Sequence, residues 1–126
     1  MGLYESNYLQ LARLAGNPVA LTGTHVSRVA GDCELVLTVL ERSRYTSELL
    51  LTYLLPVNGN LAAATERVPD LRLRVYHDAR LLEAAGEAGN GPERELERRW
   101  ARNIMLNKWL EYCAERGHGF APHQAR

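Results

Sequence analysis

The stretch Leu71–Leu82, which reads LRLRVYHDARLL, constrains the fold more than any other part of the sequence. Apolar and polar residues alternate along it, and strict alternation is typical of a β-strand with one buried face. The apolar face would carry Leu71, Leu73, Val75, Ala79 and Leu81. His77 has the same parity, so the pattern places an ionisable ring among leucines. The stretch therefore predicts a half-buried strand with one anomalous residue.

Three further strands are predicted before this one. They lie at about residues 19–29, 33–42 and 45–55, and the stretch above forms the fourth at about 71–83. The run 33–42 is apolar on both faces, which favours a central strand, although leucine-rich runs are also compatible with helix. Residues 56–70 carry turn signals and are interpreted as a loop.

The hairpin between the second and third strands is predicted to have a three-residue loop, Arg42–Arg44. A loop of this length brings the leucines of both strands to one face, and the hydrophobic pattern sets the register of a sheet. The expected pairs are Leu37 with Leu49, Leu35 with Leu51 and Glu41 with Tyr45. A two-residue loop would place Thr38 opposite Leu49 instead.

One helix is predicted at each end of the chain. Residues 3–15 have apolar residues at helical spacing and are followed by Gly16, a residue favoured just past a helix C-terminus. Residues 92–116 begin with Pro92, which suits the first helical turn, and stop before Gly117. The second half of this helix has a broad apolar face of Met105, Leu106, Trp109, Tyr112 and Cys113. That face is expected to cover the sheet.

These elements predict an α+β fold: a four-stranded antiparallel meander sheet with an N-terminal and a long C-terminal helix packed on it. With 126 residues the chain has the size of one ordinary domain, so residues 1–126 are interpreted as a single domain. Residues 86–91 form a glycine-rich connector in this interpretation, and residues 118–126 form a loose tail.

The composition narrows the classes of function. Fifteen basic and fifteen acidic residues give a net charge of zero, which argues against nucleic-acid binding. The N-terminus lacks the pattern of a signal peptide, and no apolar run approaches the ~20 residues that span a bilayer. A cytoplasmic protein without membrane contact is therefore expected.

Cys33 and Cys113 lack metal or redox spacing and are expected to be buried reduced thiols; no metal and no cofactor are indicated.

Three patches of the sequence point to a family. They read Tyr4-Glu5-Ser6-Asn7-Tyr8, then Glu41-Arg42-Ser43-Arg44-Tyr45-Thr46 followed by Leu73-Arg74-Val75-Tyr76-His77-Asp78-Ala79, and finally Trp109-Leu110-Glu111-Tyr112-Cys113. With these patches the chain resembles the YqiB family, bacterial proteins of unknown function, although it is short between residues 83 and 92. The Arg-Tyr-Thr and Tyr-His-Asp-Ala pieces are the most specific. The resemblance implies a small soluble bacterial protein and supplies no activity and no catalytic residues.

His77 is the first candidate for chemistry, because imidazole titrates near neutrality and binds metals. Adjacent strand residues point to opposite faces, so Asp78 is not expected to orient the ring. Glu41 would lie on the same face of a meander and could do so. The alternative, which we favour, is a structural histidine that is hydrogen-bonded to a backbone carbonyl or to that carboxylate.

Arginines on the opposite face suggest a second kind of site. The outward-facing arginines are Arg72, Arg74 and Arg80, with Arg42 and Arg44 nearby in the hairpin. Guanidinium groups suit phosphate or carboxylate ligands. The alternative is a solvated face whose arginines pair across strands with Glu34 and Glu48. Together with the histidine patch, the candidate ligand-binding residues are Arg44, Tyr45, Tyr76, His77, Asp78 and Glu41.

No residue pattern in the chain indicates a catalytic constellation. The leading expectation is therefore a non-enzymatic module that binds a partner protein, or a second copy of itself as a homo-oligomer, through its C-terminal helix. The alternative is binding or processing of a small anionic ligand, such as a nucleotide, at the candidate residues.

Overall fold

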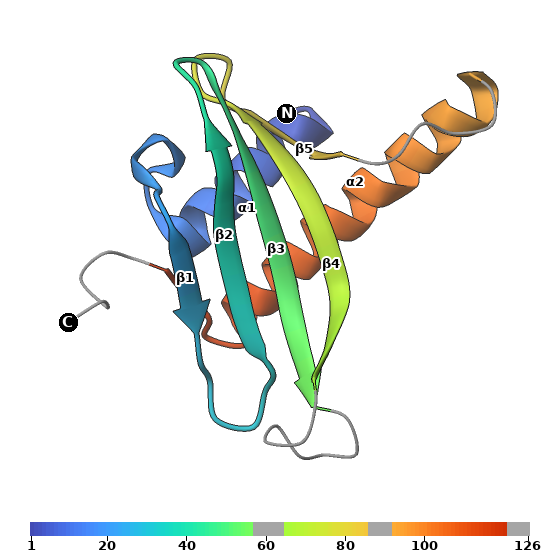
Figure 1. Ribbon diagram of the computed structural model, residues 1–126. Helices are drawn as coiled ribbons and strands as arrows, with labels where there is room; N and C mark the ends of the chain where they lie inside the picture. The colour runs from blue at the N-terminus through green and yellow to red at the C-terminus, as the bar shows by residue number, and fades with distance from the viewer. Residues whose placement is uncertain (57–64, 86–91, 121–126) are drawn as a thin grey trace.

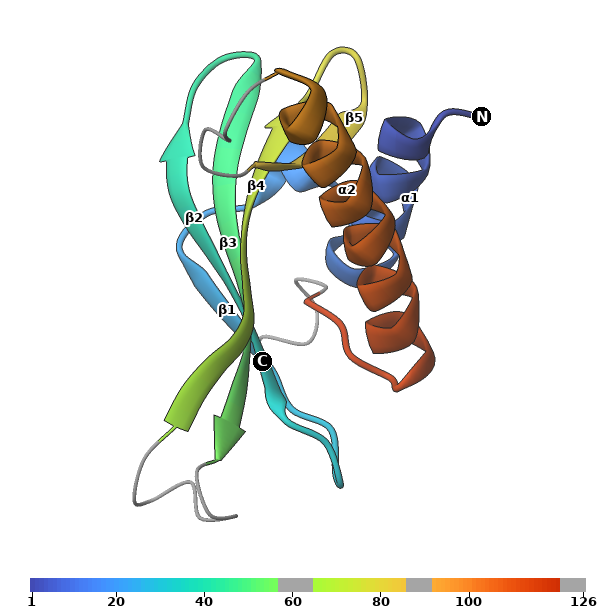
Figure 2. The same cartoon turned by 90° about the vertical axis from the view of Figure 1, so that its right-hand side faces the viewer.

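The computed structural model describes residues 1–56, 65–85 and 92–120. Within them, five antiparallel strands form one sheet in the order β1-β2-β3-β4-β5, and α1 and α2 lie together on one face of it (Figure 1 and Figure 2). The elements are α1 (Leu3–Ala15), the short 3₁₀ helix η1 (Pro18–Ala20), β1 (Thr24–Ser27), β2 (Glu34–Arg42), β3 (Thr46–Pro56), β4 (Thr65–Tyr76), β5 (Leu81–Ala85) and α2 (Pro92–Glu115). We call the helix-covered face of the sheet the inner face and the other the outer face. The predicted α+β class and antiparallel sheet are confirmed.

The stretch Leu71–Leu82 is not one strand, so the prediction of four strands is wrong. β4 ends at Tyr76, and β5 begins opposite it, at Leu81, after a four-residue turn. Arg80 closes this turn with a φ of 55°, in the left-handed region. The alternation was misleading because Leu81 and Leu82 are both apolar, and it is Leu82 that is fully buried.

Two strands differ in length from their prediction. β4 begins at Thr65, so part of the segment that was interpreted as a loop is strand. β1 covers only Thr24–Ser27 of the predicted 19–29. Asn17 accepts a hydrogen bond from the Val19 amide and starts the 3₁₀ helix η1 in place of strand. The local turn chemistry therefore overrides the β-propensity of this threonine- and valine-rich run.

The β2–β3 register is shifted by two residues from the expected one. The observed pairs are Leu35 with Tyr53, Leu37 with Leu51 and Val39 with Leu49. The connecting loop is 43–45, and a β-bulge between Val39 and Glu41 places Glu41 opposite Glu48. A two-residue shift leaves each leucine on the same face, so the hydrophobic pattern could not exclude it.

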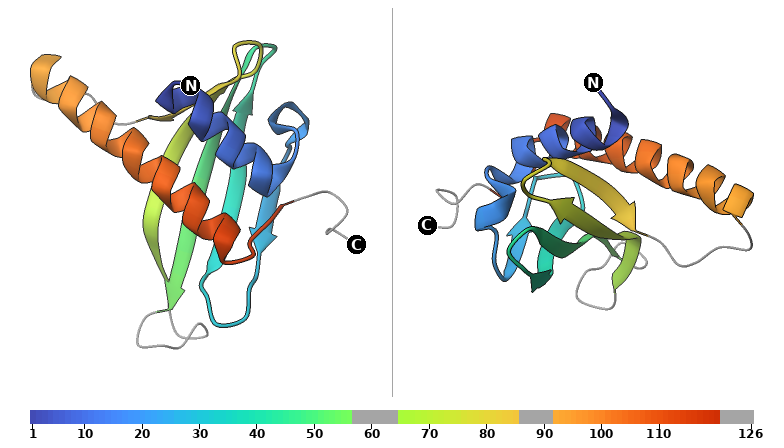
Figure 3. Two further views of the ribbon diagram at one scale, coloured as in Figure 1. Left: turned by 180° about the vertical axis from the view of Figure 1, so that it is seen from behind. Right: turned by 90° about the horizontal axis from the view of Figure 1, so that it is seen from above.

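Leucines fill the space between the sheet and the helices. The fully buried side chains of the inner face include Leu35, Leu37, Leu49, Leu51, Leu73, Val75 and Leu82, and those of the helices include Leu11, Leu14, Leu106, Leu110 and Cys113. α2 crosses this face obliquely, so its C-terminal half covers the sheet while its N-terminal half projects beyond the β5 edge (Figure 3). Both cysteines are free; Cys113 is buried and Cys33 partly buried.

A cluster of buried asparagines joins both helices to the edge strand β5. Asn103 of α2 accepts a hydrogen bond from the Ala84 amide at 2.8 Å, and Asn7 of α1 donates to the Leu82 carbonyl at 3.2 Å. Asn7 also donates to the Asn103 side chain, at 3.3 Å, and accepts from Asn107 at 3.0 Å. Asn7 and Asn103 are fully buried, so each bond replaces water that the site excludes. These amides satisfy backbone groups that an edge strand would otherwise leave unpaired.

The C-terminal segment is ordered as far as it is described, so the prediction of a loose tail is wrong for residues 118–120. His118 and Phe120 are 5% and 4% exposed, and the Phe120 amide donates to the Leu14 carbonyl. The predictions for 57–64, 86–91 and 121–126 lie outside the described residues.

We expect Asn103→Ala to lower the free energy of unfolding by about 2–4 kcal/mol. The substitution leaves the buried Ala84 amide without its hydrogen-bond acceptor and removes a partner of Asn7. The Ala84 amide should also exchange with solvent faster relative to its neighbours. Denaturant titration and hydrogen exchange measure these effects.

The control is Asn17→Ala, which removes an exposed cap and should lower the free energy of unfolding by about 1 kcal/mol. An Asn103→Ala protein as stable as this control would show that the cluster contributes little.

Candidate functional site

The candidate residues chosen from the sequence do not converge on one site. Glu41 and Tyr76 share a hollow of about 290 Å³ on the outer face, together with Ser43, Thr46, Glu48 and Arg74. Arg74 donates to Glu48 at 2.9 Å, so one of the expected cross-strand ion pairs is present. The other candidates lie away from this hollow.

His77 lies on the inner side of the hairpin end, away from Glu41. Its Nε2 is 2.8 Å from the Ser47 hydroxyl, and its amide donates to the Tyr45 carbonyl at 2.8 Å. The expected His77–Glu41 pair does not form, because the β2 bulge turns Glu41 to the outer face. Burial, and secondly the charge of Arg42, lower the pKa of His77, so the ring is neutral at neutral pH.

Arg44, Tyr45 and Asp78 have local roles in the turns. The Arg44 guanidinium carbon lies 5.2 Å from the centre of the Tyr45 ring, in a cation–π contact. Tyr45 is 55% exposed. The Asp78 carboxylate accepts a hydrogen bond from the Ala79 amide at 3.0 Å, within the β4–β5 turn. These contacts shape the two hairpins.

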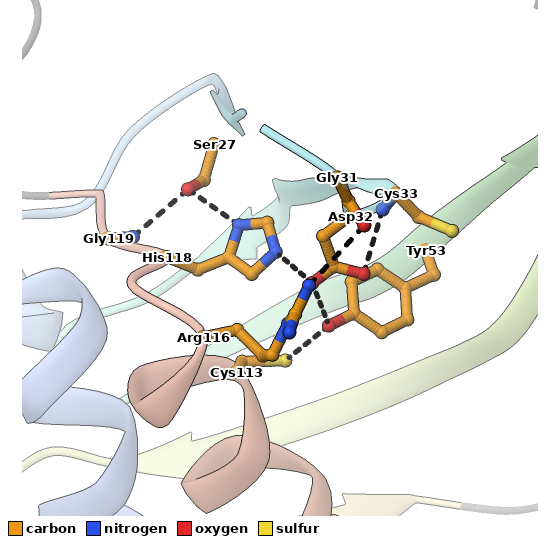
Figure 4. A network of polar contacts seen from close by, with 9 residues as sticks. All are labelled: Ser27, Gly31, Asp32, Cys33, Tyr53, Cys113, Arg116, His118 and Gly119. Atoms are coloured by element: carbon orange, nitrogen blue, oxygen red, sulfur yellow. Dashed lines mark hydrogen bonds and ion pairs between the residues drawn. The ribbon is translucent and has the colours of Figure 1, made fainter. Parts of the chain in front are cut away.

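A polar network at the other end of the sheet was not predicted from the sequence (Figure 4). His118 stands between Ser27 and Asp32: its Nδ1 is 2.9 Å from the Ser27 hydroxyl, and its Nε2 is 3.0 Å from an Asp32 carboxylate oxygen. Arg116 contacts the same carboxylate at 3.5 Å, and the Gly119 amide donates to the Ser27 hydroxyl at 3.0 Å. The network therefore links β1, the loop before β2 and the end of α2.

Serine, histidine and aspartate are bonded here in the same order as in a hydrolase triad, but this serine is buried, whereas a catalytic serine is open to substrate. Ser27 is only 6% exposed and the His118 side chain is fully buried. The Ser27 hydroxyl is bonded on both sides, to His118 and to the Gly119 amide, and is not presented to a substrate. The geometry therefore favours a clamp that holds the C-terminal segment on β1.

Two further members of the network keep their protons at neutral pH. Burial raises the pKa of Cys113 to about 11, and burial also raises the pKa of Tyr53. The Tyr53 hydroxyl donates to Asp32 at 3.3 Å, and the Cys113 thiol lies 3.4 Å from that hydroxyl. A nucleophilic cysteine must be a thiolate, so Cys113 is a structural residue.

The Asp32 carboxylate carries the charge of the network. Burial would raise its pKa, but hydrogen bonds from the Cys33 amide and His118, with the charges of His118 and Arg116, outweigh burial and lower the pKa. The Asp32 side chain is 11% exposed, so its negative charge is compensated by these partners rather than by water.

Apolar side chains are exposed on the projecting half of α2. Leu96 and Trp100 are 63% and 61% exposed and lie one turn apart on the same side of the helix. Met105 and Tyr112 are 44% and 47% exposed on another side of α2. Exposed apolar side chains that are neighbours indicate a binding surface more often than isolated ones do.

Sequence reasoning missed the network because its members are far apart in the chain. His118 and Asp32 are separated by 86 positions, and neither was among the candidate residues. Arg99 and Arg102 of α2 were not among the candidate residues either, although they border a hollow beside β5. The spacing of residues in a single sequence does not indicate which distant residues come into contact.

Comparison with known proteins gives one match. A family model described as "Protein of unknown function (DUF1249)" matches residues 10–119. No curated protein and no solved structure matches the chain. In the described part of the chain, no helix is long and apolar enough to cross a membrane, and no group of three or more His, Cys, Asp or Glu side chains could hold a metal ion.

We expect Asp32→Asn to lower the free energy of unfolding at neutral pH by about 2–4 kcal/mol, because the neutral amide cannot offset the Arg116 charge or accept as strong a hydrogen bond from His118. The pKa of Asp32 is lowered in the folded state. Its stabilising effect is therefore fully present above the ordinary value of 3.8 and is lost as the pH falls through the lowered pKa. Denaturant titrations across this pH range should show the variant and the wild type converging in acid.

Asp78→Asn makes the same chemical change at an exposed turn residue, and it should lower the free energy of unfolding at neutral pH by less than Asp32→Asn does. A constant gap between Asp32→Asn and the wild type down to the lowest pH would argue against a role for the Asp32 charge.

Proposed function

The chain belongs to the DUF1249 family of proteins of unknown function, and we propose that it is a non-enzymatic module that binds a protein through α2. The narrower likeness to the YqiB proteins of bacteria is part of this proposal. One observation carries it: the exposed Leu96–Trp100 pair on the half of α2 that projects beyond the sheet (Figure 3).

The pair has the properties of a binding anchor. A tryptophan and a leucine that are neighbours on a helix offer a large apolar area, and tryptophan is enriched among residues that dominate binding energy. Trp109, the other tryptophan, is 8% exposed and packs against Tyr53, with ring centres 5.4 Å apart. The protein thus buries one tryptophan in its core and leaves Trp100 available to a partner.

The simplest partner is a second copy of the chain. Glu97 and Arg99 lie on either side of the apolar pair around the helix, so this part of α2 carries both signs of charge. In a two-fold arrangement the same patch contacts itself, and antiparallel helices would place Glu97 of one copy near arginines of the other. Another protein with an apolar groove and mixed charge is the alternative partner.

We expect the wild type to show a mass that rises with concentration towards a dimer, and Trp100→Ser to weaken this association at least about tenfold. Size-exclusion chromatography with light scattering measures the mass. Circular dichroism should show an unchanged fold, since Trp100 is outside the core.

The matched control is Tyr112→Ser, which changes a comparably exposed aromatic residue on another side of α2 and should leave the mass unchanged. A wild type that stays monomeric at every concentration and enriches no partner in pull-down experiments would rule out the proposal.

A further inference from the structure

A separate hollow, of about 210 Å³, lies between the N-terminal half of α1 and the turn that joins β4 to β5. Glu5, Tyr8 and Leu9 line it from the helix, and Ala79 and Arg80 line it from the turn. We call it the turn hollow. It shares no residue with the Leu96–Trp100 surface, so what it binds is a separate question from the proposed function.

The asparagine cluster holds the two sides of the turn hollow together. Asn7 of α1 donates to the Leu82 carbonyl at 3.2 Å, and β5 begins at Leu81, directly after Arg80. On the helix side, Tyr8 packs against the core. The helix and the turn are therefore held at a fixed separation, and the space between them is part of the fold.

Arg80 has a backbone conformation that arginine rarely adopts. Its φ of 55° lies in the left-handed region, and among the described residues it is the only non-glycine residue with a positive φ. Glycine adopts this region without the steric cost that a side chain incurs. Within the same residues the Arg80 side chain forms no hydrogen bond and no ion pair. Strained residues cluster at sites that hold ligands, and no contact inside the protein accounts for an arginine here.

The turn hollow has an unpaired charge of each sign. Glu5 and Arg80 both line it, yet no ion pair joins them, and in the described part of the chain neither side chain has another hydrogen-bonding or ionic partner. The Glu5 carboxylate can thus accept from a cation, and the Arg80 guanidinium can donate to an anion. The remaining lining, Tyr8, Leu9 and Ala79, is largely apolar.

We propose that the turn hollow binds a small zwitterion with an apolar body, a free apolar amino acid. The Glu5 carboxylate accepts from the ammonium group of the ligand, and the Arg80 guanidinium, whose planar donors match a carboxylate, holds its other end. The apolar body of the ligand packs on Tyr8 and Leu9. Sites for drug-sized ligands span about 300–1,000 Å³. A hollow of about 210 Å³ suits a smaller molecule, of the size of an amino acid.

The probes are L-leucine, N-acetyl-L-leucine, which keeps only the negative charge, and L-leucinamide, which keeps only the positive charge. Each is titrated into the whole protein and followed by NMR. Leucine should bind saturably with a dissociation constant below about 10 mM and shift the amides of Glu5, Leu9 and Ala79. Each blocked compound should bind at least about fivefold more weakly, because it loses one charged contact. Equal affinities for all three compounds, or no saturable binding of leucine up to about 50 mM, would overturn the proposal.

Arg80→Gln and Arg98→Gln form a matched pair: both remove one charge from an exposed arginine, and Arg98 does not line the turn hollow. Arg80→Gln should weaken leucine binding at least about fivefold and make leucine and leucinamide bind alike, whereas Arg98→Gln should weaken leucine binding less than about twofold. Equal weakening by both variants would show only a response to net charge and would count against the site.

Arg80→Gly separates binding from folding. Glycine suits a φ of 55°, so the melting temperature should stay within about 2 °C of the wild-type value or rise, while leucine binding weakens as much as in Arg80→Gln. An Arg80→Gly protein that binds leucine like the wild type would rule out the site. The dimer test uses other residues and another measurement, so either proposal can fail without the other.

Discussion

The structure depends on how the short edge strand β5 satisfies its backbone hydrogen bonds. β5 pairs with β4 on one side only, and the amide of Ala84 and the carbonyl of Leu82 face away from that pairing, into the protein. Asn103 and Asn7 bond to these two groups. A buried amide without a partner costs about 1–3 kcal/mol, so the asparagines determine where both helices can lie. The leucine core would tolerate other helix rotations, whereas these directional bonds do not.

The opposite edge of the sheet is closed in a different way. There the end of the chain after α2 lies against β1, and the Ser27 hydroxyl bonds to both His118 and the Gly119 amide. Asp32 supplies the charge that holds His118 in place. Exposed sheet edges invite pairing with other chains, and at each edge side chains hydrogen-bond to the outermost strand: Asn7 and Asn103 to β5, and His118 to Ser27 of β1.

Elements with a strong local signal could be predicted, and contacts between distant elements could not. The bounds of α1 follow from helical spacing and Gly16, and the leucines of β2 and β3 were assigned to the correct face. The fifth strand was missed because Leu81 and Leu82 are interchangeable in an alternating pattern. Polar residues with apolar neighbours were the hardest to interpret: nothing near Asn7 or His118 in the sequence indicates their burial. The candidate site was predicted in part, since Tyr76 and Arg74 were singled out, whereas Arg99 and Arg102, which line the hollow beside β5, were not.

The position of Asn103 on α2 has a mechanical consequence. The helix is held at its C-terminal end by the clamp and near its middle by Asn103, while the turns before Arg99 project freely (Figure 3). Such a helix resembles a lever that is attached to the sheet by the hydrogen bond from the Ala84 amide to Asn103. A tilt of the projecting arm would act on the Ala84 bond, and Ala84 is paired with Leu73 of β4. A load on the arm would thus reach the sheet backbone at two points of β5, at the Ala84 amide through Asn103 and at the Leu82 carbonyl through Asn7.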